Sequence, residues 1–214
     1  MSKKYDLFDL DGTITDSALG ITNSVMYALK KFGIEETDRT KLYKFIGPPL
    51  TESFEKFYGF TKEQSLDGVK YYREYYHDKG IYENRVYDGL EEVLKKINEA
   101  GKQAIVATSK PEKYAKIIID HFHLTKYFTC VAGMEMDGGR GTKAQVITYA
   151  LEKNDITDKS NVLMIGDREH DVIGAHENGL DCLGILYGFG SRKEFEEAGA
   201  DYIRENVEDI LQFV

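Results

Sequence analysis

Short, continuously apolar runs recur along this chain, and segments with helical periodicity separate them. The runs span Tyr5–Leu10, Gln103–Thr108, Phe128–Ala132, Asn161–Ile165, Asp181–Leu186 and Ala200–Ile203. Runs that are apolar on both faces are typical of parallel strands covered by helices on both sides. The helical patterns span Gly89–Ala100, Pro111–Phe122, Lys143–Lys153 and His170–Asn178. This alternation predicts an α/β fold with a doubly wound parallel sheet.

One stretch interrupts the alternation, because residues 17–82 contain no strand pattern. Helical apolar faces occur instead at Ser17–Phe32, Leu50–Tyr58 and Lys62–Lys79. We therefore expect two domains: a core formed by residues 1–15 and 84–214, and an all-helical domain formed by residues 16–83 that is inserted after the first strand.

Composition excludes some classes of function. The formal net charge of −9 over 214 residues argues against a nucleic-acid surface, which needs a basic stripe. No apolar run approaches membrane-spanning length, and Met1–Lys4 leaves no room for a signal peptide before the first strand. We therefore expect a cytoplasmic protein. Cys130 and Cys182 lie far apart in apolar runs, which favours buried thiols over a disulfide or metal pair.

Acidic residues follow two of the predicted strands. Asp9 and Asp11 form the sequence D-x-D-G-T, and Asp167 and Asp171 form G-D-x-x-x-D. Ligands of open α/β sheets bind beyond the carboxyl ends of the strands. Paired carboxylates there can hold a hard cation, and one of them can attack phosphorus. A solvated acidic turn and an ordinary acidic helix start are the alternatives. A calcium EF-hand loop fails because Gly12 occupies the fourth loop position instead of the sixth.

Hydroxyl and cationic residues occupy comparable positions. Thr108 and Ser109 end the second strand just before a predicted helix, so they can form a phosphate seat or simply an N-cap. Arg140 and Lys143 lie near a glycine-rich connection, and Lys143 starts another predicted helix. One of these two cations could neutralise a phosphate and keep a carboxylate ionised, although a solvated lysine is the alternative.

Taken together, these four motifs resemble the haloacid dehalogenase-like phosphatase superfamily in order and spacing over almost the whole chain. The helical insert is similar to the alpha-helical cap of that family, and the resemblance implies a Rossmann-like catalytic core. It implies that Asp9 attacks phosphorus and forms an aspartyl-phosphate. It also implies that Asp11 protonates the leaving group and then deprotonates water, while Lys143 bridges the phosphate and Asp9.

The same resemblance implies the ligands of the site. Mg²⁺ would be held by the side chain of Asp9, the backbone carbonyl of Asp11, and Asp167, with Asp171 close by. Ser109 is the favoured phosphate-binding hydroxyl, and Thr108 is the alternative. The substrate-binding residues expected are Gly12, Thr108, Ser109 and Lys143.

Several stretches, among them "FIGPPL", "VATSKPEKYA" and "GDREHDVIGAHENG", resemble the branch that contains phosphoglycolate phosphatases and bacterial 5′-nucleotidase-like phosphatases. Ile21 stands where beta-phosphoglucomutase has a histidine, which weakens a mutase assignment. True dehalogenases lack the second aspartate of the first motif, so the presence of Asp11 at this position argues against dehalogenation. We expect a magnesium-dependent phosphatase acting on small phosphomonoesters. A sugar-phosphate phosphotransferase or mutase, and a non-catalytic phospho-ligand binder, are the alternatives.

Other expectations concern the insert and the partners. The Gly47–Leu50 loop either faces the active site or only breaks a helix, and the tyrosines of the insert either stack on a nucleobase or pack the helices. His170 is expected near the metal rather than as its ligand. The expected partner is a small phosphorylated metabolite, with no nucleic acid and no membrane. We expect a monomer, with a dimer as the alternative.

Overall fold

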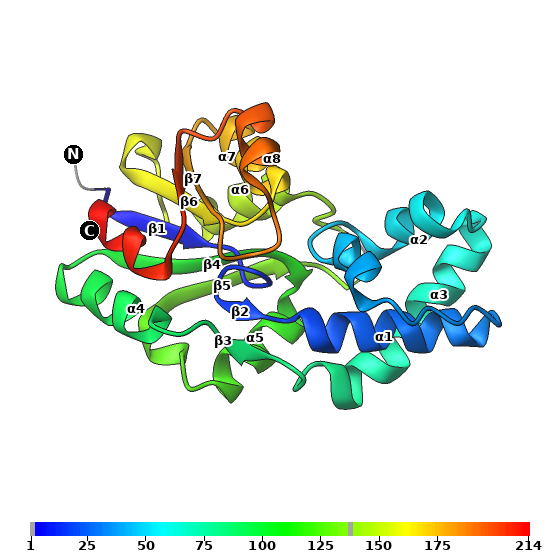
Figure 1. Ribbon diagram of the computed structural model, residues 1–214. Helices are drawn as coiled ribbons and strands as arrows, with labels where there is room; N and C mark the ends of the chain where they lie inside the picture. Colours follow the sequence, from blue (N-terminus) through cyan, green and yellow to red (C-terminus); the bar gives the residue numbers. More distant parts are fainter. Residues whose placement is uncertain (1–2, 137–138) are drawn as a thin grey trace. The chain divides into compact units, whose positions relative to one another are not determined.

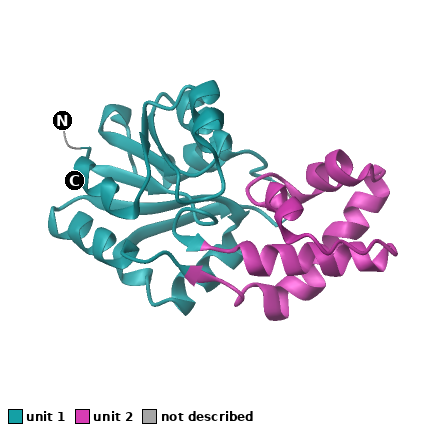
Figure 2. Cartoon of the chain, viewed as in Figure 1, with its two compact units in different colours: residues 1–15, 86–214 teal, residues 16–85 magenta. Residues whose placement is uncertain are grey.

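The computed structural model describes residues 3–136 and 139–214. The chain divides into two compact units, one formed by residues 1–15 and 86–214 and the other by residues 16–85 (Figure 2). Residues 1, 2, 137 and 138 of the expected core lie outside the described residues. That residues 1–15 with 84–214 and residues 16–83 act as separate domains stays a prediction.

The larger unit is built on a six-stranded sheet in the order β5-β4-β1-β6-β7-β8 (Figure 1). The strands are β1 (Tyr5–Phe8), β4 (Gln103–Pro111), β5 (Phe128–Met134), β6 (Val162–Gly166), β7 (Asp181–Ile185) and β8 (Tyr202–Arg204). Each neighbouring pair is parallel, and Tyr5 of β1 is in register with Gln103 of β4 and Val162 of β6. The predicted α/β fold is confirmed.

Helices cover both faces of this sheet. Figure 1 shows α4 and α5 on one side and α6, α7 and α8 on the other. Their bounds are α4 Leu90–Glu99, α5 Glu112–His121, α6 Lys143–Lys153, α7 Glu169–Glu177 and α8 Arg192–Ala198. Every residue of β6 is buried, as expected for a strand with helices on both faces. Short 3₁₀ helices span Thr125–Tyr127, Lys159–Asn161 and Val207–Phe213.

The chain order positions a binding site at the centre of the sheet. From β1 the chain goes to β4 and β5 on one side, and it then crosses to β6, β7 and β8 on the other. Such a reversal of strand order leaves a crevice at the carboxyl ends of the central strands. The residues that follow β1, β4 and β6 therefore face one another.

Several predicted boundaries differ from the structure by a few residues, and two of them lie beside the candidate site residues. The first strand ends at Phe8 rather than Leu10, and β4 continues to Pro111 rather than ending at Thr108. Pro111 is consequently the last strand residue and the N-cap of α5, not part of its first helical turn. Both predicted buried thiols, Cys130 and Cys182, are free and buried.

The smaller unit is helical. Its elements are α1 (Ala18–Lys31), a 3₁₀ helix (Arg39–Phe45), α2 (Leu50–Tyr58), α3 (Lys62–Tyr75) and a π-helix (Tyr76–Gly80). Two-residue strands, β2 (Thr15–Asp16) and β3 (Arg85–Val86), form a separate small sheet. Thr61 starts α3 with a capping box to Gln64, and Gly59 ends α2 in a left-handed conformation.

Tyrosines of the smaller unit pack against other aromatic rings of the same unit. The Tyr72 and Tyr76 rings stack with centroids 5.3 Å apart, and Tyr75 lies 5.7 Å from Tyr27. This packing favours the structural alternative for these side chains. Pro49 is the N-cap of α2, which fits a helix boundary, and a role of the Gly47–Leu50 loop at the active site stays a prediction. Within the described ranges, none of the helices has the length and hydropathy needed to cross a membrane.

Candidate active site

The site begins where β1 ends. Asp9 directly follows the last β1 residue, and its backbone N–H donates to the Ile165 carbonyl of β6 at 2.9 Å. This bond fixes the Asp9 side chain at the carboxyl edge of the two central strands. The Asp9 side chain is almost completely buried. A buried carboxylate needs a partner charge, and the structure supplies one.

That partner is Lys143, the first residue of α6. The Thr142 side chain and Gln145 form a capping box that fixes the start of this helix. The Lys143 Nζ lies 2.8 Å from Asp9 Oδ1 and 2.7 Å from Asp171 Oδ1. It also donates to the Ala107 carbonyl at 3.0 Å. Lys143 is therefore buried between two carboxylates and a carbonyl of β4.

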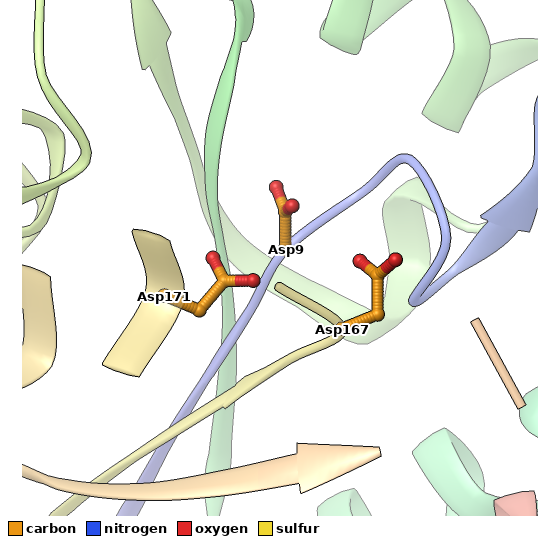
Figure 3. Close-up of side chains that lie close together, drawn as sticks. All are labelled: Asp9, Asp167 and Asp171. Carbon is orange, nitrogen blue, oxygen red and sulfur yellow. The ribbon is translucent and has the colours of Figure 1, made fainter. Parts of the chain in front are cut away.

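Two further aspartates come from the β6–α7 segment. Asp167 directly follows β6, and its carboxylate accepts hydrogen bonds from the Thr13 hydroxyl (3.2 Å) and the Phe189 N–H (2.9 Å). Asp171 lies in the first turn of α7 and accepts a bond from the Arg168 N–H at 3.1 Å. Figure 3 shows the side chains of Asp9, Asp167 and Asp171 close together at the ends of the segments that carry them. One oxygen from each lies within 4.8 Å of the others.

Gly12 makes this arrangement sterically possible. Its φ of +86° lies in the region that favours glycine, and a Cβ there would lie 2.1 Å from Asp167 Oδ2. Any side chain at residue 12 would therefore displace Asp167. The structure thus shows a steric need for Gly12 beside the carboxylates, and contact between Gly12 and a substrate stays a prediction.

The two hydroxyl residues at the end of β4 differ in their surroundings. The Thr108 side chain is buried, and its Oγ1 accepts a hydrogen bond from the Lys110 N–H at 3.2 Å. Ser109 is only half-buried. Ser109 therefore stays the favoured phosphate-binding hydroxyl, with Thr108 as the alternative.

Asp11 has a different partner from Asp9, and the sequence analysis did not identify it. The Lys110 Nζ lies 2.6 Å from Asp11 Oδ2, and both side chains are nearly buried. The signal available in the sequence was a lysine directly after Thr108 and Ser109, at the same sheet edge as Asp11. Two lysines therefore reach the D-x-D pair, one for each carboxylate.

Burial perturbs the titration of the cluster. Loss of solvent, together with the charges of Asp171 and Asp9, raises the pKa of Asp167 well above its usual range. Burial also raises the pKa of Asp171 to about 6, although Lys143 acts in the opposite direction. Burial lowers the pKa of Lys143, but the carboxylates of Asp171 and Asp9 outweigh it, so the pKa rises above the usual lysine value. Lys143 thus stays charged, but its single positive charge does not balance the buried carboxylates around it.

The residues present fit a divalent cation. Four aspartates (Asp9, Asp11, Asp167 and Asp171) lie with two lysines at this edge, which leaves two negative charges uncompensated if all are ionised. Oxygen donors from carboxylates are the ligands that Mg²⁺ prefers. Each Asp171 oxygen already has a protein partner, the Lys143 Nζ for Oδ1 and the Arg168 N–H for Oδ2, which suits a supporting position.

This geometry agrees with the comparisons to known proteins. A family model described as "Haloacid dehalogenase-like hydrolase" matches residues 7–185. The chain belongs to this haloacid dehalogenase-like hydrolase family. The family predicted from the sequence motifs is confirmed.

Individual relatives of this haloacid dehalogenase-like hydrolase carry phosphatase names. It is 45% identical to a 5′-nucleotidase of Pseudomonas aeruginosa, over 88% of this chain and 85% of that protein. A predicted phosphatase from Clostridium acetobutylicum has a crystal structure with TM-score 0.96 and 47% identity, covering 99% of this chain and 98% of the other. A phosphoglycolate phosphatase of Vibrio parahaemolyticus is 22% identical over 99% of this chain and 96% of the relative. The predicted enzyme class, a hydrolase of phosphoric monoesters, is confirmed.

Proposed function

We propose that this chain is a Mg²⁺-dependent phosphatase that hydrolyses small phosphomonoesters through an aspartyl-phosphate on Asp9. The observation that carries the proposal is the buried ion pair between Asp9 and Lys143 inside a cluster of carboxylates. Lys143 places positive charge beside the Asp9 nucleophile and beside the position of an anionic substrate. The side chains of Asp9 and Asp167 and the backbone carbonyl of Asp11 would hold the cation, with Asp171 in support.

The chemistry requires two carboxylates with different tasks. Asp9 forms the bond to phosphorus as the bond to the ester oxygen breaks, and Asp11 gives its proton to that leaving oxygen. In the second half, Asp11 takes a proton from water as the water oxygen displaces Asp9 from phosphorus. Ser109 or Thr108, Gly12 and Lys143 orient the phosphate. A bound divalent cation supplies Lewis-acid stabilisation of the phosphoryl oxygens.

The direct test is phosphate release from p-nitrophenyl phosphate by the purified chain, with and without added Mg²⁺. We expect turnover with Mg²⁺ and loss of turnover after chelation, restored by Mg²⁺. Purified Asp9→Asn protein controls for contaminating phosphatases. Release that does not depend on the metal, or equal release by the variant, would contradict the proposal.

The substrate is proposed on the names of relatives. A 5′-nucleotidase and a phosphoglycolate phosphatase are among them, so nucleoside monophosphates and phosphoglycolate are the substrates to test first. A panel that includes sugar phosphates should be ranked by kcat/KM. A phosphotransferase or mutase would yield an isomerised or phosphorylated sugar without stoichiometric free phosphate, and a pure binder would yield neither.

We further propose a cytoplasmic protein that acts as a monomer on a small metabolite, with neither nucleic acid nor membrane as a partner. The net charge of −9 supports the exclusion of nucleic acid. Light scattering of the purified chain tests the monomer, and a mass twice that of the chain would indicate the dimer. Fractionation of the source cells tests the location.

A further inference from the structure

Lys110 is a buried cation at the active site for which the proposed mechanism so far has no role. Its Nζ lies 2.6 Å from Asp11 Oδ2, and its side chain is 6% exposed. The other oxygen, Asp11 Oδ1, is buried and has no hydrogen-bond partner among the described residues. Asp11 Oδ2 is thus held by the lysine, and Asp11 Oδ1 has no competing hydrogen bond among the described residues.

The backbone around Lys110 is built to keep this position. Thr108 pairs with Gly133 of β5 and Pro111 pairs with the next residue, Met134, so Ser109 and Lys110 form a bulge in β4. A bulge redirects a side chain that regular alternation would place elsewhere. The Thr108 hydroxyl accepts the Lys110 N–H inside this bulge. The two strand pairs that flank the bulge and the hydrogen bond within it together define the backbone position of Lys110.

Gly133 is the second part of this arrangement. A Cβ at Gly133 would lie 2.6 Å from the Lys110 carbonyl oxygen, so the bulge passes too close to β5 for any side chain there. The carbonyl is backbone and cannot move away without reshaping the bulge. The bulge of β4 that contains Lys110 therefore requires a glycine at position 133 of β5.

We propose that Lys110 is a positioning residue for Asp11. By holding Oδ2, it orients the carboxyl group so that Oδ1 gives the proton to the leaving oxygen while the bond from Asp9 to phosphorus forms and the ester bond breaks. The proton leaves Asp11, the electron pair of the broken bond goes to the leaving oxygen, and Asp11 becomes a carboxylate facing the Lys110 ammonium. This inference rests on the proposed function, in which Asp11 is the proton donor.

The test compares two substrates that differ in how much they need that proton. p-Nitrophenolate is a good leaving group without protonation, whereas the phenolate of phenyl phosphate is a poorer one. The quantity to measure is kcat/KM, which covers the steps up to release of the phenol and is independent of the later hydrolysis of the aspartyl-phosphate. The ratio to compare is kcat/KM for phenyl phosphate divided by kcat/KM for p-nitrophenyl phosphate. Within one variant this ratio is also independent of the fraction of folded protein.

For Lys110→Met we expect kcat/KM for phenyl phosphate to fall about 10- to 100-fold more than kcat/KM for p-nitrophenyl phosphate. This additional loss is a part of the roughly 10²–10⁴-fold rate enhancement that general acid catalysis supplies. Lys110→Arg, which keeps the charge, should recover part of the ratio. Lys102→Met removes the lysine of another buried pair, with Asp6, at the opposite end of β1 and β4, and should leave the ratio unchanged. An equal loss on both substrates, or an unchanged ratio, in Lys110→Met overturns the inference.

Asp11→Asn separates failure of this inference from failure of the proposed function. If Asp11→Asn lowers the ratio and Lys110→Met does not, Asp11 is the proton donor and Lys110 does not position it. If Asp11→Asn also leaves the ratio unchanged, the proton-donor role itself is wrong. If Lys110→Met yields no folded protein, the ratio in Lys110→Gln decides between the same outcomes.

Discussion

A buried lysine–aspartate pair lies at each end of the neighbouring strands β1 and β4, and the two ends differ in their balance of charge. At the amino end, the Lys102 Nζ lies 2.7 Å from Asp6 Oδ2 and also donates to the Phe213 carbonyl at 2.8 Å. One lysine thus matches one aspartate, and a carbonyl near the end of the chain takes a further ammonium hydrogen. The amino end is complete without any ligand.

At the carboxyl end, Lys110 and Lys143 face four aspartates. The excess negative charge is costly in a buried place, so this end is stable only with a proton or a cation added. A lysine–aspartate pair of matched charge thus lies at one end of the two strands, and an excess of carboxylates lies at the other. Variants at equivalent positions of the two ends test this difference.

The largest difference is expected between Asp9→Asn and Asp6→Asn. An amide oxygen at residue 9 is too weak a nucleophile to attack phosphorus, so turnover should fall by roughly 10⁵-fold or more, as when other hydrolases lose their nucleophile. Asp6→Asn changes a carboxylate within β1, three residues before Asp9, and should keep kcat per folded molecule within about twofold, since it lies outside the site. Steady-state kinetics with p-nitrophenyl phosphate measures both. Similar activity of the two variants would mean that the charge excess has no catalytic meaning.

The next difference concerns the lysines. Lys143→Met leaves Asp9 and Asp171 without their shared cation and should lower kcat by about 10²–10³-fold, the usual effect of removing one charge-stabilising group. Lys102→Met should leave kcat per folded molecule near that of the wild type. Each variant breaks a buried ion pair, so each should lose about 3–5 kcal/mol of unfolding free energy.

Denaturant unfolding monitored by circular dichroism, combined with active-site titration, separates the two effects for these lysine variants. If Lys102→Met lowers kcat as much as Lys143→Met, the two ends are not functionally distinct.

The sequence predicted most of the residues that meet at the carboxyl end, because parallel sheets gather the residues that follow their strands. Asp9, Lys143 and Asp167 each lie next to an element whose apolar or helical pattern was clear, so their meeting followed from topology. The spacing of Asp167 and Asp171 on a strand end and helix start likewise agrees with the observed cluster. Geometry fixed by regular elements was therefore predictable.

Lys110 could not be predicted in the same way, because its position depends on an irregularity. Pro111 suggested a helix start, whereas the strand continues through a bulge to Pro111. The bulge depends on Gly133 in another strand, a tertiary contact that no local pattern contains. Helix α8 was missed because it has only seven residues, although Ser191 and Glu194 give it an N-terminal cap.

A divalent cation should stabilise the carboxyl end only. Because it binds the folded carboxylate cluster, Mg²⁺ at 100 times its dissociation constant should raise the unfolding free energy by about 2.7 kcal/mol. For a chain of this size that corresponds to a rise in Tm of roughly 5–10 °C. Asp167→Asn should lose this rise, and Asp6→Asn should keep it. A rise that survives in Asp167→Asn would place the cation elsewhere.

The last difference, which leaves catalysis untouched, is a dependence of stability on pH at the amino end. Burial raises the pKa of Asp6 from 3.8 to about 6, despite the opposing effect of Lys102. Because the folded carboxyl binds its proton more tightly than the unfolded one, its contribution to stability is complete below pH 3.8. That contribution is lost as pH rises through about 6. The loss amounts to at most about 3 kcal/mol. The difference in unfolding free energy between wild type and Asp6→Asn, measured from pH 4 to 7.5, should change in that window in favour of the variant. If the difference is constant with pH, Asp6 ionises as easily in the folded chain as in the unfolded one, and the ion pair with Lys102 fully offsets the cost of burial.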